Sequence, residues 1–339
     1  MQTSVAAFDA ADTQVAERAY EIEAACVAAD LPDFPPVNRR RFFGEMSHPW
    51  PGTEVHRALG YLDGVPVGYL KIKFPTLENT DNAEVDISVL PQYRRRGVGR
   101  ALHEYAVRMV RGKGRKRIFG RTVASLAGGP VRNEAGRAFA LAMGATSALT
   151  DVRRRLDVRA RDDAALDRLL ADAWRRAAGY SLVRWQGATP PEYLDDVAYL
   201  DSRLLEDAPM GDLEWEPEKM DAARVRGVEA AFDAWGGRRY HAGIRHDATG
   251  RLVAWTTVEC GSQAPWHAFQ QITIVEPKHR GHRLGTIIKI ENLRHVLAHE
   301  PDLRVIDTFN AAVNRHMISI NEKMGFRPVD SWDNWQLAL

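Results

Sequence analysis

Two short stretches combine arginine and glycine in a way that suits a phosphorylated ligand. Residues 89–99 read V-L-P-Q-Y-R-R-R-G-V-G, and residues 275–285 read V-E-P-K-H-R-G-H-R-L-G. Glycine lets a phosphate approach the backbone closely, and arginine adds positive charge. The first N–H groups of a following helix are also free to bind an anion. Each stretch therefore predicts a pyrophosphate-binding loop.

The flanking sequence places each loop between a strand and a helix. Residues 83–89 and 269–275 are rich in β-branched residues, and apolar residues recur at helical spacing from Val98 and from Leu284. Neither loop contains the G-x-x-x-x-G-K-[ST] pattern of P-loops or the G-x-G-x-x-G pattern of dinucleotide-binding proteins. We therefore expect a phosphorylated ligand that is neither a nucleoside triphosphate nor NAD.

The two loops belong to a repeat. They lie at a constant offset of 186 residues. Residues 142–145 and 323–326 form a second pair of similar segments. The chain is therefore expected to be a duplication of one α/β unit, with domains at 1–159 and 160–339. The first copy is predicted to end with a strand at 151–158, whose three arginines, 153–155, are expected to face solvent. A connecting helix at 162–178 and a strand at 180–185 would follow.

The repeated pattern resembles a known family. V-x-P-x-x-R-x-x-G-x-G on a strand-to-helix turn resembles the acyl-CoA signature of the GNAT N-acyltransferase superfamily. Residues 310–314 and 321–326 resemble the last strand–helix stretch of that family. Two copies in register are most similar to the tandem GNAT architecture of mycothiol synthases and related acyltransferases. The resemblance implies an α/β fold of two tandem GNAT-like domains, with mixed sheets and flanking helices, and acetyl-CoA as the acyl donor.

The resemblance also implies which residues bind the donor. In the family the loop binds the CoA pyrophosphate, and the backbone of the preceding strand bonds the pantetheine and polarises the acetyl carbonyl. Arg283 stands where the first copy has Gly97, which costs about 1 kcal/mol if that position needs a positive φ and otherwise adds charge near the phosphates. The implied CoA-binding residues are Val89, Arg94, Arg95, Arg96, Gly97, Val98, Gly99, Arg100, Val275, Arg280, Gly281, His282, Arg283, Leu284, Gly285, Thr286 and Asn314.

Acyl transfer to an amine needs a proton acceptor and donors for the oxyanion. Strand alternation places Gln271 and Thr273 on the face of Val275, where they would order a water. His267, at the start of the same strand, is a candidate base. The corresponding face of the first copy is apolar, with Glu84 and Asp86 on the other face unless a bulge switches them. No general base is assigned from the sequence.

The CoA thiolate that leaves in this reaction can take up a proton from an enzymic acid. Family members often carry a tyrosine four residues before the downstream glycine, where its hydroxyl can protonate the thiolate. This chain has Ala140 and Asn321 at those positions. Asn321 is expected to donate a hydrogen bond but no proton. Gln271 and Asn321 are therefore the predicted catalytic residues, and turnover is predicted mainly in the second domain.

The predicted activity is acetyl transfer from acetyl-CoA to a primary amine of a small molecule. Two alternatives stay open: a non-catalytic acyl-CoA-binding sensor or scaffold, and a mycothiol-synthase-like enzyme that forms amides. The segments expected to shape the acceptor pocket, residues 31–50 and 207–235, contain no recognisable motif. The acceptor is therefore not identified by the sequence.

Composition limits the remaining classes of protein. Of 339 residues, 45% are hydrophobic and 27% are charged, which excludes a wholly disordered or fibrous chain. The net charge of +1 lacks the basic excess of a nucleic-acid binder. Two distant cysteines exclude a disulfide scaffold and a four-ligand zinc site, and no apolar run reaches about 18 residues. We expect a cytoplasmic monomer or homodimer without a metal.

Overall fold

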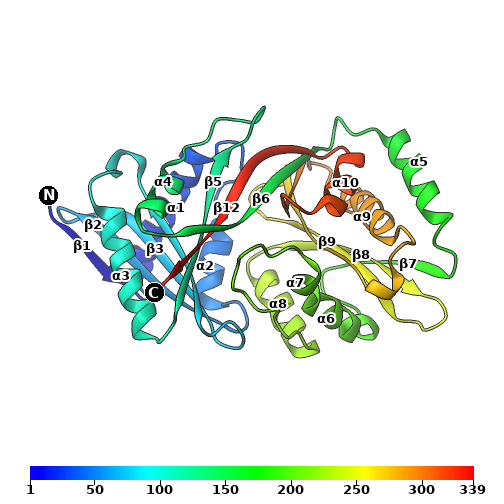
Figure 1. Cartoon of the computed structure of the whole chain (residues 1–339), viewed down its shortest axis with the longest axis horizontal. Helices are drawn as coiled ribbons and strands as arrows, with labels where there is room; N and C mark the ends of the chain where they lie inside the picture. Colours follow the sequence, from blue (N-terminus) through cyan, green and yellow to red (C-terminus); the bar gives the residue numbers. More distant parts are fainter. The chain divides into compact units, whose positions relative to one another are not determined.

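The computed structural model describes residues 1–339 and contains twelve strands and ten α-helices (Figure 1). The chain folds into two compact units. Unit 1 comprises Met1–Asp151, Met210–Glu216 and Asp330–Leu339, and unit 2 comprises Val152–Pro209 and Pro217–Val329. The domain ranges 1–159 and 160–339 stay a prediction. The compact units divide first at residue 151, and two later segments, Met210–Glu216 and Asp330–Leu339, belong to unit 1.

Unit 1 is built on a mixed sheet with the strand order β1-β2-β3-β4-β5-β12-β6. Neighbours from β1 to β4 are antiparallel, β4 and β5 are parallel, and β12 is antiparallel to β5. β6 starts in unit 1 and ends in unit 2, whereas β12 does the reverse. The strands are β1 (Thr3–Ala7), β2 (Thr53–Leu62), β3 (Val65–Pro75), β4 (Asn82–Val89), β5 (Arg117–Ser125), β6 (Thr146–Asp157) and β12 (Arg327–Ala338).

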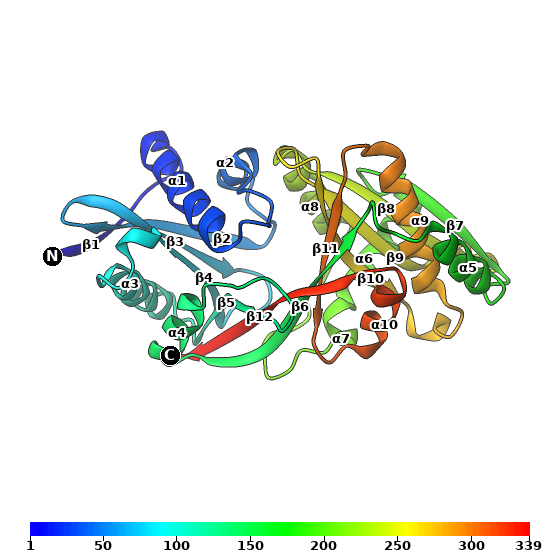
Figure 2. The ribbon, with the colours of Figure 1, turned by 90° about the horizontal axis from the view of Figure 1, so that it is seen from above.

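Helices cover both faces of the unit 1 sheet. Figure 2 shows α1 (Thr13–Asp30) and α2 (Arg39–Ser47) on one face, with α3 (Val98–Gly112) and α4 (Ala135–Ala142) on the other. Successive residues of β3 follow this division: Gly68 faces α3, where a Cβ would lie 2.8 Å from Leu102, and the Tyr69 ring lies 5.8 Å from that of Phe42 on α2. The helices thus bury the two alternating faces of each strand.

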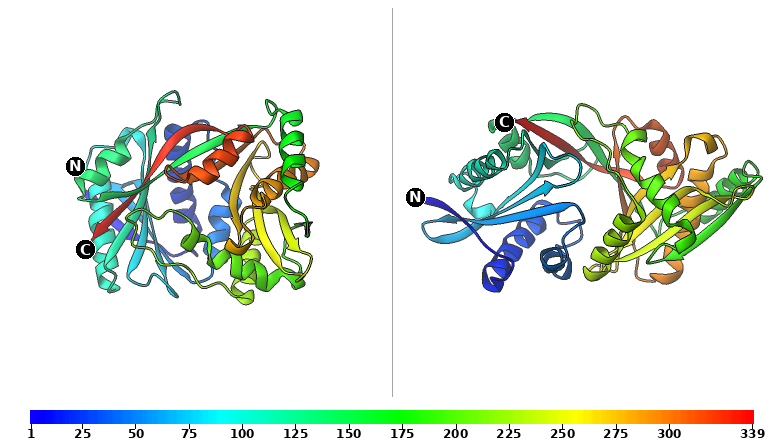
Figure 3. Two further views of the ribbon diagram at one scale, coloured as in Figure 1. Left: turned by 45° about the vertical axis from the view of Figure 1, so that its right-hand side comes forward. Right: turned by 90° about the horizontal axis from the view of Figure 1, so that it is seen from below.

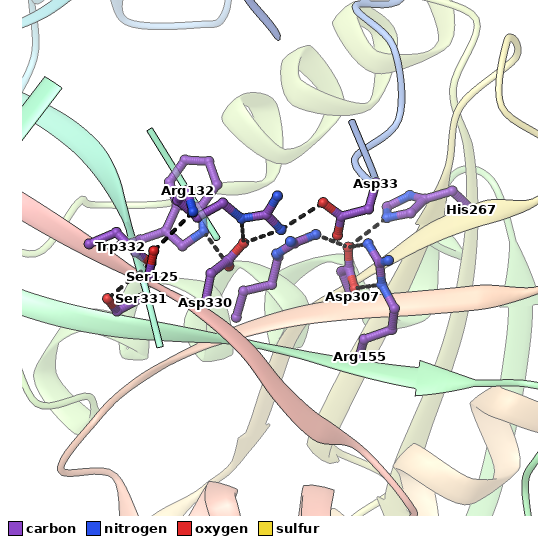
Figure 4. Close-up of polar contacts among 11 residues, drawn as sticks. Asp33, Ser125, Arg132, Arg155, His267, Asp307, Asp330, Ser331 and Trp332 are labelled. Atoms are coloured by element: carbon purple, nitrogen blue, oxygen red, sulfur yellow. Dashed lines mark hydrogen bonds and ion pairs between the residues drawn. The ribbon is translucent and has the colours of Figure 1, made fainter. Parts of the chain in front are cut away.

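A buried ion pair fixes the last strand to unit 1. Arg132, with a side chain only 1% exposed, contacts Asp330 at 2.8 Å and Asp33 at 2.6 Å (Figure 4). Its backbone N–H donates to Ser125 Oγ, and the Trp332 indole N–H donates to Asp330. A buried arginine needs such acceptors, because an unpaired buried charge is costly.

Unit 2 repeats the arrangement with the strand order β6-β11-β10-β9-β8-β7. β10 and β11 are parallel, and the neighbours from β10 to β7 are antiparallel. The strands are β7 (Tyr180–Gln186), β8 (Arg238–His246), β9 (Leu252–Cys260), β10 (His267–Val275) and β11 (Val305–Ala311). The confirmed fold class is therefore α/β, with mixed sheets and flanking helices in both units.

Two cores form on the two faces of the unit 2 sheet. Ala254 joins a core with residues of α5, α9 and α10, whereas its neighbour Trp255 joins a core with residues of α6 and α8. Figure 3 shows these helices around the strands. The helices are α5 (Asp163–Trp174), α6 (Leu194–Ser202), α7 (Leu204–Asp207), α8 (Ala222–Ala234), α9 (Leu284–His299) and α10 (Arg315–Lys323).

The elements predicted around the repeat are confirmed. Strands β4 and β10 end at the predicted residues, and helices α3 and α9 begin at Val98 and Leu284. The strand, helix and strand expected between residues 151 and 185 correspond to β6, α5 and β7. None of the ten helices combines the length and apolar character that a membrane-spanning helix needs.

One lysine lies inside the unit 2 core. Lys289 on α9 is 1% exposed, its Nζ atom has no hydrogen-bond partner, and it lies 5.5 Å from the centre of the Phe326 ring. Burial lowers the pKa of Lys289 to about 7, because the apolar surroundings disfavour the ammonium form.

We predict that Lys289→Met raises the free energy of unfolding by roughly 2–4 kcal/mol at pH 6.5 and by less at pH 9.5. Between pH 7 and 10.5 the unfolded chain binds the proton that the folded chain has lost, so wild-type stability rises with pH in this window. Chemical denaturation at the two pH values measures the effect, with the exposed Lys323→Met as control. An equal change in the free energy of unfolding at the two pH values would contradict this account.

Candidate functional site

Each unit has a backbone anion site where a strand leads through a short turn into a helix. In unit 1, β4 is followed by a 3-10 turn at Pro91–Tyr93 and then by α3; in unit 2, β10 is followed by Pro277–His279 and then by α9. The amides of residues 95–100 and of residues 281–285 find no backbone acceptor within the protein. These N–H groups, at the positive ends of two helices, are suited to bind a pyrophosphate.

The two loops share a backbone shape but place their glycines differently. Each loop has two residues with positive φ: Arg95 (63°) and Gly97 (90°) in unit 1, and Gly281 (90°) and Arg283 (59°) in unit 2. The position of Arg283 therefore does require the left-handed conformation that the sequence left undecided. Glycine and arginine have exchanged places between the copies, so each loop has one strained arginine.

The first arginine of each loop fastens the loop to its own strand. Arg94 Nε donates to the Val89 carbonyl at 3.0 Å, and Arg280 Nε donates to the Val275 carbonyl at 3.2 Å. The rest of the Arg94 guanidinium forms a bidentate pair with Asp30 at 2.6 and 2.9 Å. Arg280 also contacts an aspartate, Asp207, at 2.8 Å, but its side chain is 52% exposed. Both arginines thus shape the loop, and Arg280 is the more accessible to a ligand.

The other predicted CoA-binding residues fall into three groups: buried side chains, glycines at the start of a helix, and polar side chains near the loop surface. The side chains of Val98 and Leu284 lie in the core, and Thr286 is buried, so at these positions only the backbone faces the loop. Gly99 and Gly285 lie in the first helical turns, where a Cβ would meet Phe139 at 3.3 Å and Ile320 at 3.7 Å respectively. Arg95, Arg96 and Arg100 are exposed, and His282 Nδ1 lies 3.0 Å from the Arg176 carbonyl.

In both units the parallel strands part beside the loop. β4 and β5 pair only from Asn82–Glu84 to Arg117–Phe119, although the strands continue to Val89 and Ser125. β10 and β11 pair only from His267–Gln270 to Val305–Thr308, although β10 continues to Val275. The facing edges beyond these points have no partner strand. Their peptide groups are free to bond an extended, amide-containing ligand as an added strand.

A β-bulge distinguishes the two units. The register of β10 against β9 shifts between Gln270 and Thr273, whereas β4 pairs with β3 without a shift. The prediction that Gln271 and Thr273 share a face is wrong, because the bulge interrupts the alternation. Thr273 and Gln270 instead both reach the Thr256 hydroxyl, at 2.8 and 2.9 Å.

Gln271 joins a polar group that the sequence did not identify. The exposed Gln271 donates to Glu259 Oε2 at 2.9 Å, and Arg239 Nε donates to Glu259 Oε1 at 2.9 Å. Burial raises the pKa of Asp201 on α6 to about 6, with a contribution from Glu218, while Arg239 opposes the shift. A carboxylate that titrates near neutrality suits general-base catalysis. No motif indicates Asp201 or Glu259, because they lie on α6 and β9, far apart in sequence.

His267 lies in a buried ion cluster. Its Nε2 is 3.0 Å from Asp307 Oδ2, and Asp307 also contacts Arg153 at 2.9 Å and Arg155 at 2.7 Å (Figure 4). Burial lowers the pKa of His267, and Asp307 opposes this shift. The expectation that arginines 153–155 face solvent is wrong: Arg153 is fully buried, since Asp307 compensates its charge. His267 is therefore engaged in fixing β10 to its neighbours.

The two predicted asparagines have structural partners. Asn314 is the N-cap of α10, and its side chain accepts from the N–H of Met317 at 3.2 Å. Asn321 is fully buried and donates to Asn310 Oδ1 at 2.6 Å, while its own Oδ1 has no partner. The catalytic role of Asn321 stays a prediction, as does that of Gln271.

Neither cysteine is suited to act as a nucleophile. Cys26 and Cys260 are both buried, and burial raises the pKa of their thiols to about 11 and about 12. Such thiols stay protonated at neutral pH. No group of three or more His, Cys, Asp or Glu side chains is arranged to hold a metal ion.

Comparison with known proteins agrees with this geometry. The sequence model of the Acetyltransferase (GNAT) family matches residues 18–127. A tandem GNAT protein from the clavulanic acid biosynthesis pathway is 32% identical, with a TM-score of 0.83 over 99% of this chain and 98% of that chain. A GCN5-related N-acetyltransferase from Sphaerobacter thermophilus has 13% identity and a TM-score of 0.63, over 99% and 95% of the two chains. None of the curated proteins matches the sequence.

We predict that Arg283→Gly raises the free energy of unfolding by about 1 kcal/mol, because glycine adopts the left-handed conformation without strain. Thermal or chemical denaturation measures the change, and Arg95→Gly is the matched variant in unit 1. Arg100→Gly, inside a helix, should instead destabilise the protein. A loss of stability in Arg283→Gly would show that its side chain contributes more than its strain costs.

Proposed function

The chain belongs to the GNAT acetyltransferase family and is an acyltransferase with two units in tandem, and we propose that it acetylates a primary amine of a small molecule. Acetyl-CoA is the proposed donor and unit 2 the main place of turnover. The 32% identical tandem protein belongs to a biosynthesis pathway, which supports a small-molecule acceptor over a macromolecule.

The donor would bind across the loop and the parted strands. The pyrophosphate would accept hydrogen bonds from the amides of residues 281–285, and the pantetheine amides would pair with the free edge of β10. The acetyl carbonyl would then lie near the bulge, where a backbone N–H can stabilise the oxyanion. The same contacts are available to the donor in unit 1, along β4 and residues 95–100.

The β-bulge of β10 is the observation that favours turnover in unit 2. It leaves Gln271 on the face of Glu259 and Arg239 while it moves Thr273 to the opposite face, so that a polar group that can order a water adjoins the free strand edge. Bulges are common next to active sites, since they redirect side chains. β4 has no bulge, and its residues continue the regular alternation.

The reaction would proceed by direct attack. The neutral amine forms a bond to the acetyl carbon, the C–S bond breaks, and CoA leaves as a thiolate. Asp201 would accept the proton of the amine through ordered water. Thiols have a pKa near 8.5, so departure as a thiolate is feasible without an enzymic acid. No covalent enzyme intermediate is required, in keeping with the two inert cysteines.

The variants Gly285→Asp and Gly99→Asp should distinguish the two units. Each places a carboxylate in the first turn of a helix, where it suits the helix dipole but repels the pyrophosphate. We expect Gly285→Asp to weaken CoA binding to unit 2 by about ten- to hundredfold and to remove turnover. Gly99→Asp should retain turnover. Calorimetry with CoA and thiol release from acetyl-CoA over a panel of amines give the two readouts.

Three results would contradict the proposal. Loss of turnover in folded Gly99→Asp alone would show that unit 1, and not unit 2, catalyses the reaction. Unchanged CoA affinity and stoichiometry in both variants would show that the loops do not bind the donor. Tight CoA binding without thiol release for any amine would favour the sensor or scaffold.

The pH profile should identify the proton acceptor. For an amine with a pKa near 10, log(kcat/KM) should rise with a slope of two below about pH 6 and a slope of one above it. The break reflects Asp201, which stays protonated below its raised pKa. Asp201→Asn should remove the break and lower the rate, while the exposed Asp195→Asn should keep it. An unchanged break in Asp201→Asn would exclude this base, and a descending limb below about pH 9 would reveal an enzymic acid.

A further inference from the structure

The loop of unit 2, residues 275–285, contains two histidines, and the loop of unit 1, residues 89–99, contains none. By the repeat offset, His279 stands at the position of Tyr93, and His282 stands at that of Arg96. Arginine keeps its charge throughout the physiological range, whereas histidine gains or loses a proton between about pH 5 and 8. One loop therefore has a permanent positive charge where the other has a charge that depends on pH.

A hydrogen bond determines which nitrogen of the neutral His282 ring carries the hydrogen. His282 Nδ1 lies 3.0 Å from the Arg176 carbonyl. A carbonyl only accepts, so Nδ1 must donate. In the neutral ring Nε2 is then an acceptor, which disfavours a phosphate oxygen beside it. When the ring takes up a proton, Nε2 becomes a donor and the ring gains a positive charge, and both changes favour a phosphate.

His282 lies among the groups proposed to bind the pyrophosphate. Its own backbone N–H is one of the free amides of residues 281–285. The next residue, Arg283, is the N-cap of α9 and has a positive φ of 59°. Because a side chain stays close to its own backbone N–H, a charge on the His282 ring acts on the phosphates at short range. In unit 1 the corresponding Arg96 is exposed and lies over the Tyr93 ring, 5.6 Å from its centre.

Three imidazoles gather around the ring of Tyr180 on β7. The centre of the phenol ring is 5.2 Å from that of His282, 5.7 Å from that of His279 and 5.3 Å from that of His246 on β8. The rings of His246 and His279 lie 4.9 Å apart. Imidazolium rings this close repel one another, so the cluster resists a second proton. A bound phosphate favours the proton on the loop ring, His282.

The other charged groups near the cluster leave His279 neutral. Its Nδ1 lies 2.9 Å from the Tyr180 hydroxyl, and its Nε2 lies 3.8 Å from Glu276 Oε2. Burial lowers the pKa of His279; Glu276 opposes this shift, and the neighbouring imidazoles and Lys278 add to it. The charge of Arg280 is already compensated by Asp207 at 2.8 Å. The loop can therefore accommodate a further positive charge.

We propose that His282 couples donor binding in unit 2 to the uptake of a proton. This coupling rests on the proposed function, because it requires residues 281–285 to bind the donor pyrophosphate. The phosphates favour the protonated ring, so binding draws a proton from solvent. Unit 2 therefore binds the donor more tightly at pH 6 than at pH 8, while unit 1, with Arg96 at this position, binds it equally at both.

Calorimetry with the full chain and 3′-dephospho-CoA tests the coupling. This probe keeps the pyrophosphate but lacks the 3′-phosphate, which loses its second proton near about pH 6 and would make any CoA site depend on pH. Gly99→Asp weakens the loop of unit 1, so its binding measures unit 2, and Gly285→Asp likewise measures unit 1. We expect Gly99→Asp to bind the probe about three- to tenfold more tightly at pH 6 than at pH 8. Gly285→Asp should bind it equally at both.

Exchanging the two loop residues gives the matched variants. Added to Gly99→Asp, His282→Arg should keep the tight binding at both pH values, and His282→Gln should keep the weak binding at both. Added to Gly285→Asp, Arg96→His should introduce the pH difference into unit 1. His299→Gln, which changes an exposed histidine at the opposite end of α9, should retain the difference in unit 2.

Proton uptake gives an independent readout. At pH 7 the enthalpy of binding to Gly99→Asp should differ between two buffers of different ionisation enthalpy. The added His282→Gln should remove this difference, because no proton is then taken up. A role of His282 in loop structure alone would not produce a buffer-dependent enthalpy.

The coupling is overturned if Gly99→Asp binds the probe equally at the two pH values, or if the difference persists with His282→Gln and His282→Arg in folded protein. An equal difference in Gly285→Asp would also overturn it, since the loop of unit 1 has no histidine. If neither Gly99→Asp nor Gly285→Asp alters binding to the chain, the loops do not bind the donor, and the proposed function fails together with the coupling.

Discussion

The parting of two parallel strands is the constraint on which both units depend. β4 and β5 pair over three residues, β10 and β11 over four, and both pairs then separate beside a helix N-terminus. Peptide groups that leave a sheet must find other partners, since a buried unpaired N–H or C=O is costly. The separation thus creates an edge that an amide-containing ligand can complete. The loop arginines, which bond the carbonyls of Val89 and Val275, hold the end of that edge in place.

The sequence predicted those features that depend on local spacing. The strand, the turn and the helix start are encoded within about twenty residues, and a constant offset of 186 made the second copy visible. The sequence also shows that Arg283 stands where the first copy has Gly97. It does not show that Arg283 adopts a positive φ, as Gly97 does. Arginine can occupy the left-handed region at a cost, so only the backbone itself reveals that both loops keep one shape.

Features that depend on distant partners were not predicted. Arg153 is buried because Asp307, 154 residues away, accepts from it, and nothing in the run of three arginines indicates such an acceptor. The bulge in β10 breaks strict alternation, so Gln271 meets Glu259 and not the face of Thr273. The segment Met210–Glu216 belongs to unit 1 although the residues on either side of it belong to unit 2, and no sequence pattern indicates this. In unit 1, Asn82 holds that segment by bonding the Glu214 carbonyl at 2.9 Å.

The two copies have diverged on the sheet face away from the loop helix. The positions of Lys71 and Lys73 in unit 1 correspond, by the repeat offset, to Thr257 and Glu259 in unit 2. In unit 1 both lysines pair with carboxylates, Lys73 with Glu84 at 3.1 Å and Lys71 with Glu45 at the longer distance of 3.8 Å, whereas in unit 2 Glu259 pairs with Arg239 at 2.9 Å. A duplicated fold can therefore keep one loop shape in both copies while the charges on the opposite face change. Because the loops and the parted strands are fixed by backbone geometry, such changes on the other face leave both of them intact.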